Sequence, residues 1–508
     1  MQLAKTFKNS YIPRGIRLMK KAKLFLLFTL LLSASMTGKS QNYGNEWINY
    51  EQQYFAIPIH QQGVFRIEYN ALINAGVPVG SFDPRSFQIF ARGEEQPLFV
   101  KNENTGLFNP GDFIEFYADK NDGWFDKGFY EDPEKHPNPN YSLINDTLSY
   151  YLTWNNSLNN RRYIIQENNN FSGYTAAPFF WYTSRQDYTS SYYAGETNNY
   201  GVTEPEYTEA EGWFDGALNL GQSRTKIIPT PNIHTAGPPA VIEMAVAGAS
   251  NYRPLNPDHH LQIQFAGQLI DTIYEGYALL RFHQSVAANN LNSSGTPFVF
   301  SSINSLGTPV DRSAIAYISV RYPHNFNMRN QGNMPMELPP SSGDRTMIAF
   351  SNFQAESSDM VWVYNLTNNV KSRAFLQDGT YRALITNPTQ TRKLFITSSQ
   401  QYINVTSIKP VSENPNAYAR FTNFMAPAHF NSDYLMITHQ KLMDPAINYR
   451  DFRNSTGYKV LLVDVEELYH QFAYGIKKHP IALRNFAKFT LANYDIKPKK
   501  LFLIGKTR

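Results

Sequence analysis

The chain has 508 residues, of which 15% are aromatic, 17% are charged and none is cysteine. This length suggests about two to four domains. Tyr and Phe, with 33 and 35 residues, favour half-buried pleated surfaces, so most of the chain is expected to form β-sheet. The lack of cysteine excludes a disulfide framework and a thiol nucleophile within these residues.

Residues 1–41 have the pattern of a secretory signal peptide. Lys20, Lys21 and Lys23 precede an apolar run over residues 24–32, and small side chains follow it. The run is shorter than the about 20 apolar residues of a membrane-spanning helix. We expect cleavage near Gln41; a retained single-helix anchor is the alternative interpretation.

The signal segment accounts for the basic charge of the whole chain. Of the 46 Lys and Arg residues, eight lie within residues 1–41, which hold none of the 42 acidic residues. The remaining chain therefore has 38 basic and 42 acidic side chains, a net charge of −4. A nucleic-acid partner would require a clustered basic face, so none is expected.

Residues 42–170 are predicted to form a small β-domain, because short strand-like runs alternate with turn signals. Within it, the oxygen-rich segment 119–123 is a candidate calcium-binding loop. An EF-hand loop needs oxygen ligands at its positions 1, 3 and 5 and a Glu at position 12. Counted from Asp119, these last two positions hold Gly123 and Tyr130, so a plain turn is predicted instead.

Residues 171–226 are predicted to form a polar, aromatic connection. It contains the aromatic run 179–182 and Trp213, near acidic residues such as Glu209 and Glu211. Exposed aromatic rings next to carboxylates could stack on sugars or hold a peptide. We favour the interpretation that the rings pack onto the adjoining sheet.

Residues 227–426 are predicted to form a β-sandwich, with alternating strands such as 261–265 and a hairpin turn at Asp378-Gly379. The pair His259-His260 is a candidate metal site. Neighbouring residues of a strand point to opposite faces, and no acidic partner stands at a suggestive spacing. No metal and no cofactor are therefore expected.

The pattern changes at Asp433. Buried strands are predicted over 434–438, 460–463 and 501–504, separated by amphipathic helices over 445–455, 466–472 and from Pro480 onward. Strands without alternation, separated by helices, indicate a parallel sheet covered on both faces. A chain that ends four residues after such a strand is expected to be truncated within a domain.

Parallel sheets bind their ligands beyond the carboxyl ends of the strands. The residues at those ends are His439, Asp464 and Gly505-Lys506. Gly505-Lys506-Thr507 lacks the earlier glycine of a phosphate-binding loop, because position 500 is Lys500. His439 could serve as a base, but a capping role at the strand end is the favoured interpretation.

The segment from Asp433 to Arg508 resembles the start of the gingipain-type (C25-like) cysteine peptidase domain. The matching motifs follow one another in the family's order, over 433–439, 449–453, 457–469, 472–475, 481–486 and 498–505. Upstream, the segments 63–67, 90–97 and 111–117 resemble the N-terminal region of the sortases of the type IX secretion system.

This resemblance implies a mixed fold, in which β-sandwich-type domains precede the first part of a caspase-like α/β domain with a parallel sheet, over 433–508. It also implies a Cys nucleophile and a His base, both beyond Arg508. His439, His470 and His479 do not lie in the family's His motif, so no residue of this chain is predicted to be catalytic and this piece alone is expected to be inactive.

The implied activity is the cleavage of C-terminal signals from exported protein cargo at the cell surface or outer membrane. Outer-membrane secretion components are possible further partners under this resemblance. The alternative is a non-catalytic surface β-protein that binds glycan or protein through its aromatic stretch.

Overall fold

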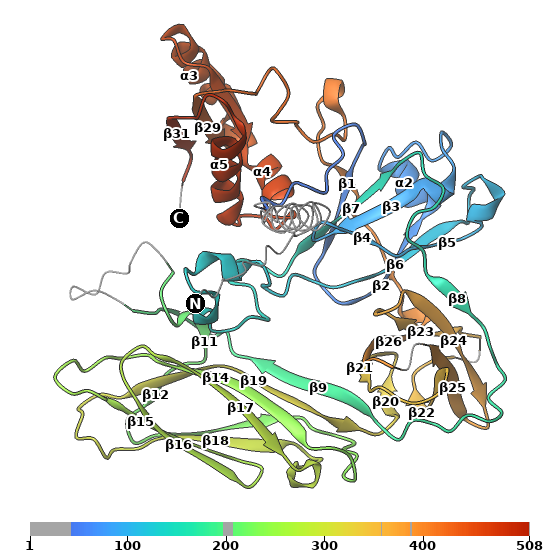
Figure 1. The fold of residues 1–508 in the computed structure, drawn as a ribbon, viewed down its shortest axis with the longest axis vertical. Helices are drawn as coiled ribbons and strands as arrows, with labels where there is room; N and C mark the ends of the chain where they lie inside the picture. The colour runs from blue at the N-terminus through green and yellow to red at the C-terminus, as the bar shows by residue number, and fades with distance from the viewer. Residues whose placement is uncertain (1–41, 197–206, 357, 387–388, 507–508) are drawn as a thin grey trace, which may run out of the picture. The chain divides into compact units, whose positions relative to one another are not determined.

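The computed structural model describes residues 42–196, 207–356, 358–386 and 389–506 (Figure 1). The predicted signal peptide, residues 1–41, lies outside the described residues. Residues 44–508 form one compact unit. Its secondary structure is largely β, with a parallel sheet and the longer α-helices near the C-terminus, which confirms the predicted mixed fold class.

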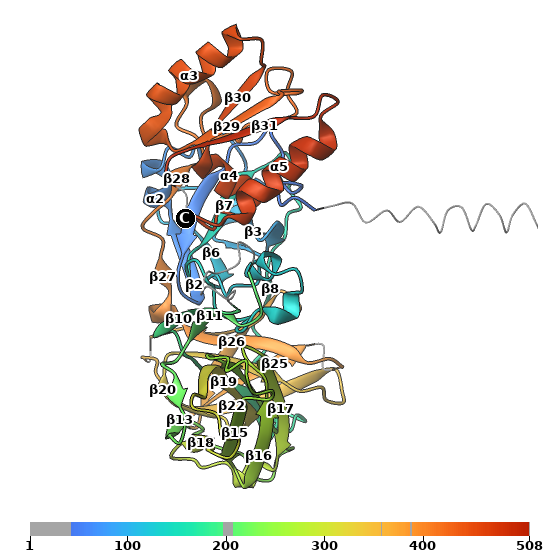
Figure 2. The same ribbon diagram turned by 90° about the vertical axis from the view of Figure 1, so that its left-hand side faces the viewer.

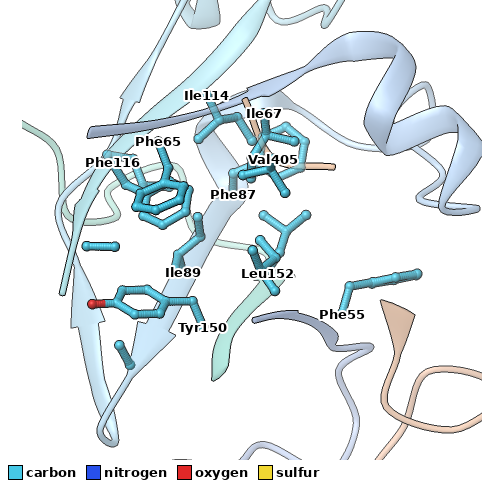
Figure 3. Packing of buried hydrophobic residues seen from close by; sticks show 14 of the residues in the cluster. Phe55, Phe65, Ile67, Phe87, Ile89, Ile114, Phe116, Tyr150, Leu152 and Val405 are labelled. Atoms are coloured by element: carbon cyan, nitrogen blue, oxygen red, sulfur yellow. The ribbon is translucent and has the colours of Figure 1, made fainter. Parts of the chain in front are cut away.

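Two sheets near the N-terminus pack face to face around a core of Phe, Ile, Leu and Val side chains (Figure 3). Their strand orders are β28-β1-β7-β3-β4 and β27-β2-β6-β5. We call these nine strands and the loops between β1 and β7 the N-terminal β-module. Its strands are β1 (Phe55–Ile59), β2 (Gly63–Glu68), β3 (Phe87–Ala91), β4 (Glu94–Gln96), β5 (Phe99–Val100), β6 (Phe113–Ala118), β7 (Leu148–Trp154), β27 (Ile403–Asn404) and β28 (Lys409–Pro410), with helix α2 (Tyr69–Asn74) after β2.

The N-terminal β-module takes two of its strands from a distant part of the chain. β27 and β28 lie within the range 227–426 that was predicted to be a separate sandwich, yet they pair with β2 and β1. Each has only two residues, so neither carries a detectable periodicity. The strands therefore cross the predicted boundaries.

A sandwich follows, in which a four-stranded sheet, β13-β18-β15-β16, packs on one end of a thirteen-stranded sheet. The strands at that end of the large sheet are β9 (Phe180–Asp187), β12 (Leu218–Asn219), β14 (Ala240–Gly248), β17 (Leu279–Val286) and β19 (Arg312–His324). The facing sheet contains β13 (Ser223–Ile228), β15 (His259–Phe265), β16 (Gln268–Tyr274) and β18 (Thr296–Ser302).

The predicted aromatic connection is partly sheet. β9 supplies a full strand between β19 and β21, and β10 (Ser191–Ala194) pairs with β11 (Glu211–Phe214). Phe180 is buried in the core, while Trp181 lies on the opposite face with the guanidinium of Arg321 4.1 Å from its ring centroid. The aromatic side chains thus pack on the sheet, as the favoured interpretation predicted.

The large sheet continues beyond β9 into a second core with its own Met, Phe and Ile side chains. The predicted hairpin at Asp378-Gly379 is confirmed, because both residues have positive φ, 51° and 73°, as a tight two-residue turn requires. The strands here are β8 (Ile164–Gln166), β20 (Asn327–Gln331), β21 (Asn333–Leu338), β22 (Arg345–Phe353), β23 (Val361–Asn365), β24 (Val370–Gln377), β25 (Thr380–Thr386) and β26 (Arg392–Ser398).

The C-terminal segment is a three-stranded parallel sheet of order β30-β29-β31. Helices α3 and α5 lie on opposite faces of it (Figure 2). The predicted alternation of strands and helices is confirmed, with β29 (Tyr434–Thr438), α3 (Met443–Ser455), β30 (Val460–Asp464), α4 (Val465–Phe472), α5 (Ile481–Asn493) and β31 (Lys500–Ile504).

The predicted burial of this segment is only partly correct. β29 is buried at all five positions, but Leu501, Phe502 and Leu503 of β31 are 50%, 40% and 36% exposed. The predicted apolar stripes of α3 and α5 are also incompletely covered, since Phe452 and Leu491 are exposed. Within the described residues β31 pairs with β29 on one side alone and is therefore an edge strand of the sheet.

Candidate functional site

The three strand ends singled out from the sequence lie at one edge of the parallel sheet. Thr438 is in register with Asp464 of β30 and with Ile504 of β31, so His439, Asp464 and Gly505 end or follow neighbouring strands. The hydroxyl of Thr438 donates to the carbonyl of Ile504 at 3.2 Å. The structure therefore brings the predicted residues to a common edge.

His439 is a capping residue, as favoured from the sequence. Its Nδ1 accepts a hydrogen bond from the backbone N–H of Lys441 at 3.1 Å, at the start of the short 3-10 helix Gln440–Leu442. An accepting Nδ1 places the proton of the neutral ring on Nε2. The ring is therefore oriented by its own turn.

Asp464 caps α4 and lies near His439. Its carboxylate accepts from the backbone N–H of Glu466 at 3.2 Å. Burial raises the pKa of Asp464, while the hydrogen bond from Glu466 and the charge of His439 oppose that rise. The carboxylate thus holds the helix terminus and adds negative charge at the strand-end edge.

Replacing this cap tests its structural role. Asp464→Ala is expected to lower the free energy of unfolding by about 1 kcal/mol, because a helix N–H loses its acceptor. Asp464→Ser, which can still cap, should lose less than half as much. Chemical denaturation of both variants provides the measurement, and equal losses would contradict a capping role.

Glu467 is a half-buried residue whose carboxylate the sequence analysis missed. It accepts from the backbone N–H of Thr422 at 2.8 Å and from Nε2 of Gln471 at 2.6 Å, and burial raises its pKa. The spacing from Asp464 to Glu467 resembles a capping box, in which the Glu would bond the N-cap backbone. Here the carboxylate instead ties α4 to the chain that precedes β29.

The histidine pair has acidic partners that spacing alone did not reveal. His259 is fully buried, with Nδ1 2.6 Å from Oδ1 of Asp311 and Nε2 3.4 Å from Oδ1 of Asp258. His260 lies on the other face, with Nε2 2.6 Å from Oδ1 of Asp271. The expectation of opposite faces is confirmed. The acidic partners are the adjacent Asp258, Asp311 just before β19 and Asp271 on β16, so no regular sequence spacing connects them with the two histidines.

These pairs do not assemble into a larger ligand set. Within the residues that the structure describes, no group of three or more His, Asp or Glu side chains has the geometry to hold a metal ion. The segment 119–123 forms local bonds instead, such as the one from the N–H of Gly123 to Oδ1 of Asn121 at 3.2 Å. Gly123 has a φ of 82°, which suits the predicted turn.

Residues 428–508 match the model of peptidase family C25. The crystal structure of dimeric latent PorU from Porphyromonas gingivalis is similar to 89% of this chain, at 15% sequence identity and a TM-score of 0.53. This chain spans 41% of the length of that PorU chain. The predicted gingipain-type resemblance is confirmed by the family match, and the fold is similar to that of the matched part of PorU.

A further solved structure is similar to a smaller part of this chain. The CBM36-1 domain of a multidomain xylanase from the hindgut metagenome of Trinervitermes trinervoides is similar to this chain over 28% of this chain and 95% of that domain, at 11% identity and a TM-score of 0.15. No curated protein matches this chain. Among the helices in the described part of the chain, none is long and apolar enough to cross a membrane.

Proposed function

We propose that this chain is the N-terminal part of a gingipain-like cysteine endopeptidase that acts as a sortase of the type IX secretion system. The observation that carries the proposal is the match of residues 428–508 to peptidase family C25, on a fold shared with PorU over 89% of the chain. The proposed substrates are exported proteins whose C-terminal signals are cleaved at the cell surface.

The chemistry requires residues that this sequence does not contain. In a cysteine peptidase a thiolate attacks the scissile carbonyl, and water or an amine then resolves the acyl-enzyme. The 508 residues contain no Cys, so the nucleophile is proposed to lie beyond Arg508 and these residues alone are proposed to be inactive. The exposed side chains of Leu501, Phe502 and Leu503 support a sheet that continues past β31.

Location and partners follow from the same proposal. Residues 1–41 are proposed to direct export as a signal peptide, and the mature protein is proposed to act at the outer-membrane surface. Its partners would be the exported cargo and components of the secretion apparatus that deliver this cargo.

The proposal is tested with two proteins, residues 42–508 and the longer polypeptide that continues the reading frame. We expect the longer protein to remove the C-terminal signal from a cargo protein and iodoacetamide to abolish this cleavage, because a thiolate carries it. Residues 42–508 should show no cleavage above background. Cleavage by residues 42–508, or cleavage that resists iodoacetamide, would contradict the proposal.

A further inference from the structure

The N-terminal β-module contacts one corner of the C-terminal segment closely. This corner, residues 470–481, contains the end of α4, the following loop and the start of α5. α4 lies beside β1 and β7 in both views of the fold (Figures 1 and 2). Three residues of the corner have positive φ, Tyr474, Gly475 and Lys478, so its backbone has a specific, tightly turned shape.

A buried pair of polar side chains joins the corner to the β-module. Nε2 of His479 lies 2.9 Å from Oδ1 of Asp126, and both side chains are fully buried. Nδ1 of His479 accepts from the backbone N–H of Ile481 at the start of α5, so both ring nitrogens have partners. The other carboxylate oxygen of Asp126 accepts from Ser142, also in the β-module, at 3.0 Å.

Strand β7 and the N-terminal segment supply further hydrogen bonds. The hydroxyl of Tyr151 lies 2.9 Å from Nδ1 of His470. Ser149 donates to the carbonyl of Gly475 at 3.2 Å, and Tyr50 donates to the buried Gln471 at 3.0 Å. Each of these groups has its hydrogen-bond partner on the other side of the interface. Separation of the two surfaces would break these bonds, and the groups would then have to bond to water.

Apolar contacts fill the space between these bonds. Tyr474 is 7% exposed and its ring centroid lies 5.2 Å from that of Trp124 and 5.4 Å from that of Phe125. Phe129 stacks on His479 with centroids 4.7 Å apart. The interface therefore combines a desolvated aromatic centre with several hydrogen-bonded pairs of polar groups, as stable protein interfaces do.

We propose that this interface is permanent, so that the N-terminal β-module remains bound to the C-terminal segment after the chain between them is cut. The chain that joins β28 to the C-terminal segment is exposed at residues 413–416, where a cut would be accessible. The β-module is then a constitutive part of the folded peptidase segment and not a propeptide released by cleavage. This inference concerns the interface and does not depend on the proposed peptidase activity.

Two glycines of the C-terminal segment provide a matched pair of variants. Gly475 has a φ of 77°, and a Cβ there would clash with Ser149 and Tyr151 of β7. Gly457 has a φ of 93°, with no atom within 4 Å of such a Cβ. Alanine at either position is strained by the left-handed backbone, but the variant at 475 alone disturbs the interface.

The experiment uses residues 42–508 with a recognition sequence for a site-specific protease inserted between Asn414 and Pro415. After complete cleavage at pH 7, we expect the two fragments to elute together in size-exclusion chromatography. Gly475→Ala should raise the dissociation constant of the cut protein by about 10- to 100-fold, as expected for overpacking a close interface. Gly457→Ala should leave it within about twofold.

Tyr151→Phe provides a milder variant in case Gly475→Ala fails to fold. It removes the hydroxyl that bonds His470 and keeps the ring, so we expect a dissociation constant raised by about 3- to 30-fold. Fragments of the otherwise unaltered chain that separate after cleavage at micromolar concentration would overturn the proposal. Equal dissociation constants for Gly475→Ala and Gly457→Ala would also overturn the assigned interface.

Discussion

The free energy of unfolding is expected to fall steeply as the pH is lowered from 7 to 4. His136 and His324 are both fully buried, and burial lowers the pKa of each to about 4. The two ring nitrogens of His136 and Nε2 of His324 have no hydrogen-bond partner within the described residues. No acceptor therefore stabilises the added proton at these positions.

The lowered pKa values of these histidines determine whether the free energy of unfolding rises or falls with pH. In the unfolded chain a histidine titrates near pH 6.5, so below that pH the unfolded state binds protons that the folded state does not. The stability that each neutral histidine contributes is fully present above about pH 6.5 and is lost as the pH falls to about 4. Each histidine therefore lowers the free energy of unfolding by about 3 kcal/mol as the pH falls from about 6.5 to about 4.

His470 adds to the same effect at the interface with the β-module. Burial also lowers its pKa to about 4, with the charge of Lys477 acting in the same direction and that of Glu466 opposing it. Acid is therefore expected to weaken the contact between His470 and Tyr151 as well. Together the three histidines should cost on the order of 6–10 kcal/mol between pH 7 and 4.

Urea denaturation at several pH values measures this loss, and two variants locate it. His324→Phe places an apolar ring among Phe180, Tyr182 and Tyr322, so the stability of this variant should depend less steeply on pH. His283→Gln is the control, because its side chain is 70% exposed and it should leave the pH dependence unchanged. A free energy of unfolding that stays constant from pH 7 to 4.5 would contradict the prediction.

The pKa of His259 is shifted in the opposite direction, so this residue does not contribute to the loss of stability in acid. Burial alone would lower its pKa, but the hydrogen bond to Asp311 and the contacts with Ser250 and Asp258 raise it overall. Its stabilising charge is present below about pH 6.5 and is lost as the pH rises through the raised pKa. We therefore expect the maximum of stability to lie near neutral pH, between these two effects.

The sequence was most informative where the fold depends on local periodicity. The strands and helices from Tyr434 to Ile504 follow from apolar runs, Pro480 and Gly457, which are features of adjacent residues. The capping role of His439 was likewise predictable, because a cap bonds to backbone two residues away. Patterns of adjacent residues thus predicted correctly which strand ends form the edge of the candidate site.

The long-range pairs could not be predicted in this way. His479 and Asp126 are 353 positions apart, and no periodicity connects them. The same is true of His259 and Asp311, and of the return of β27 and β28 to the N-terminal sheets. Such pairs depend on which surfaces meet in three dimensions, so only the structure could reveal how the C-terminal segment is held.

A second large effect is expected at a buried ion pair between the N-terminal β-module and β24. Lys371 of β24 and Glu115 of β6 are 3% and 1% exposed, with Nζ 2.7 Å from Oε2. Arg66 binds the other carboxylate oxygen of Glu115 at 2.7 Å. The ammonium group of Lys371 also lies 4.4 Å from the ring centroid of Phe99 and 4.5 Å from that of Trp362.

Removing one partner of this pair should be costly. Burial lowers the pKa of Lys371 and Glu115 opposes that shift, so the charged ammonium depends on the carboxylate. Glu115→Gln is expected to lower the free energy of unfolding by about 3–5 kcal/mol, because it leaves a buried positive charge without compensation. Lys371→Met should cost about 1–3 kcal/mol, since Arg66 still pairs with the carboxylate.

A double-mutant cycle separates the interaction from the loss of either side chain. The Glu115→Gln, Lys371→Met double variant should be more stable than the sum of the two single losses predicts, because an apolar side chain then fills the aromatic surroundings without a buried charge. Arg373→Met on the same strand is the control. The guanidinium of Arg373 lies 3.8 Å from the carboxylate of Glu167, and the two side chains are 35% and 50% exposed. Loss of this exposed pair should change the free energy of unfolding by less than about 0.5 kcal/mol. Strictly additive losses at Glu115 and Lys371, or a loss at Arg373 as large as theirs, would show that the pair does not join the β-module to β24.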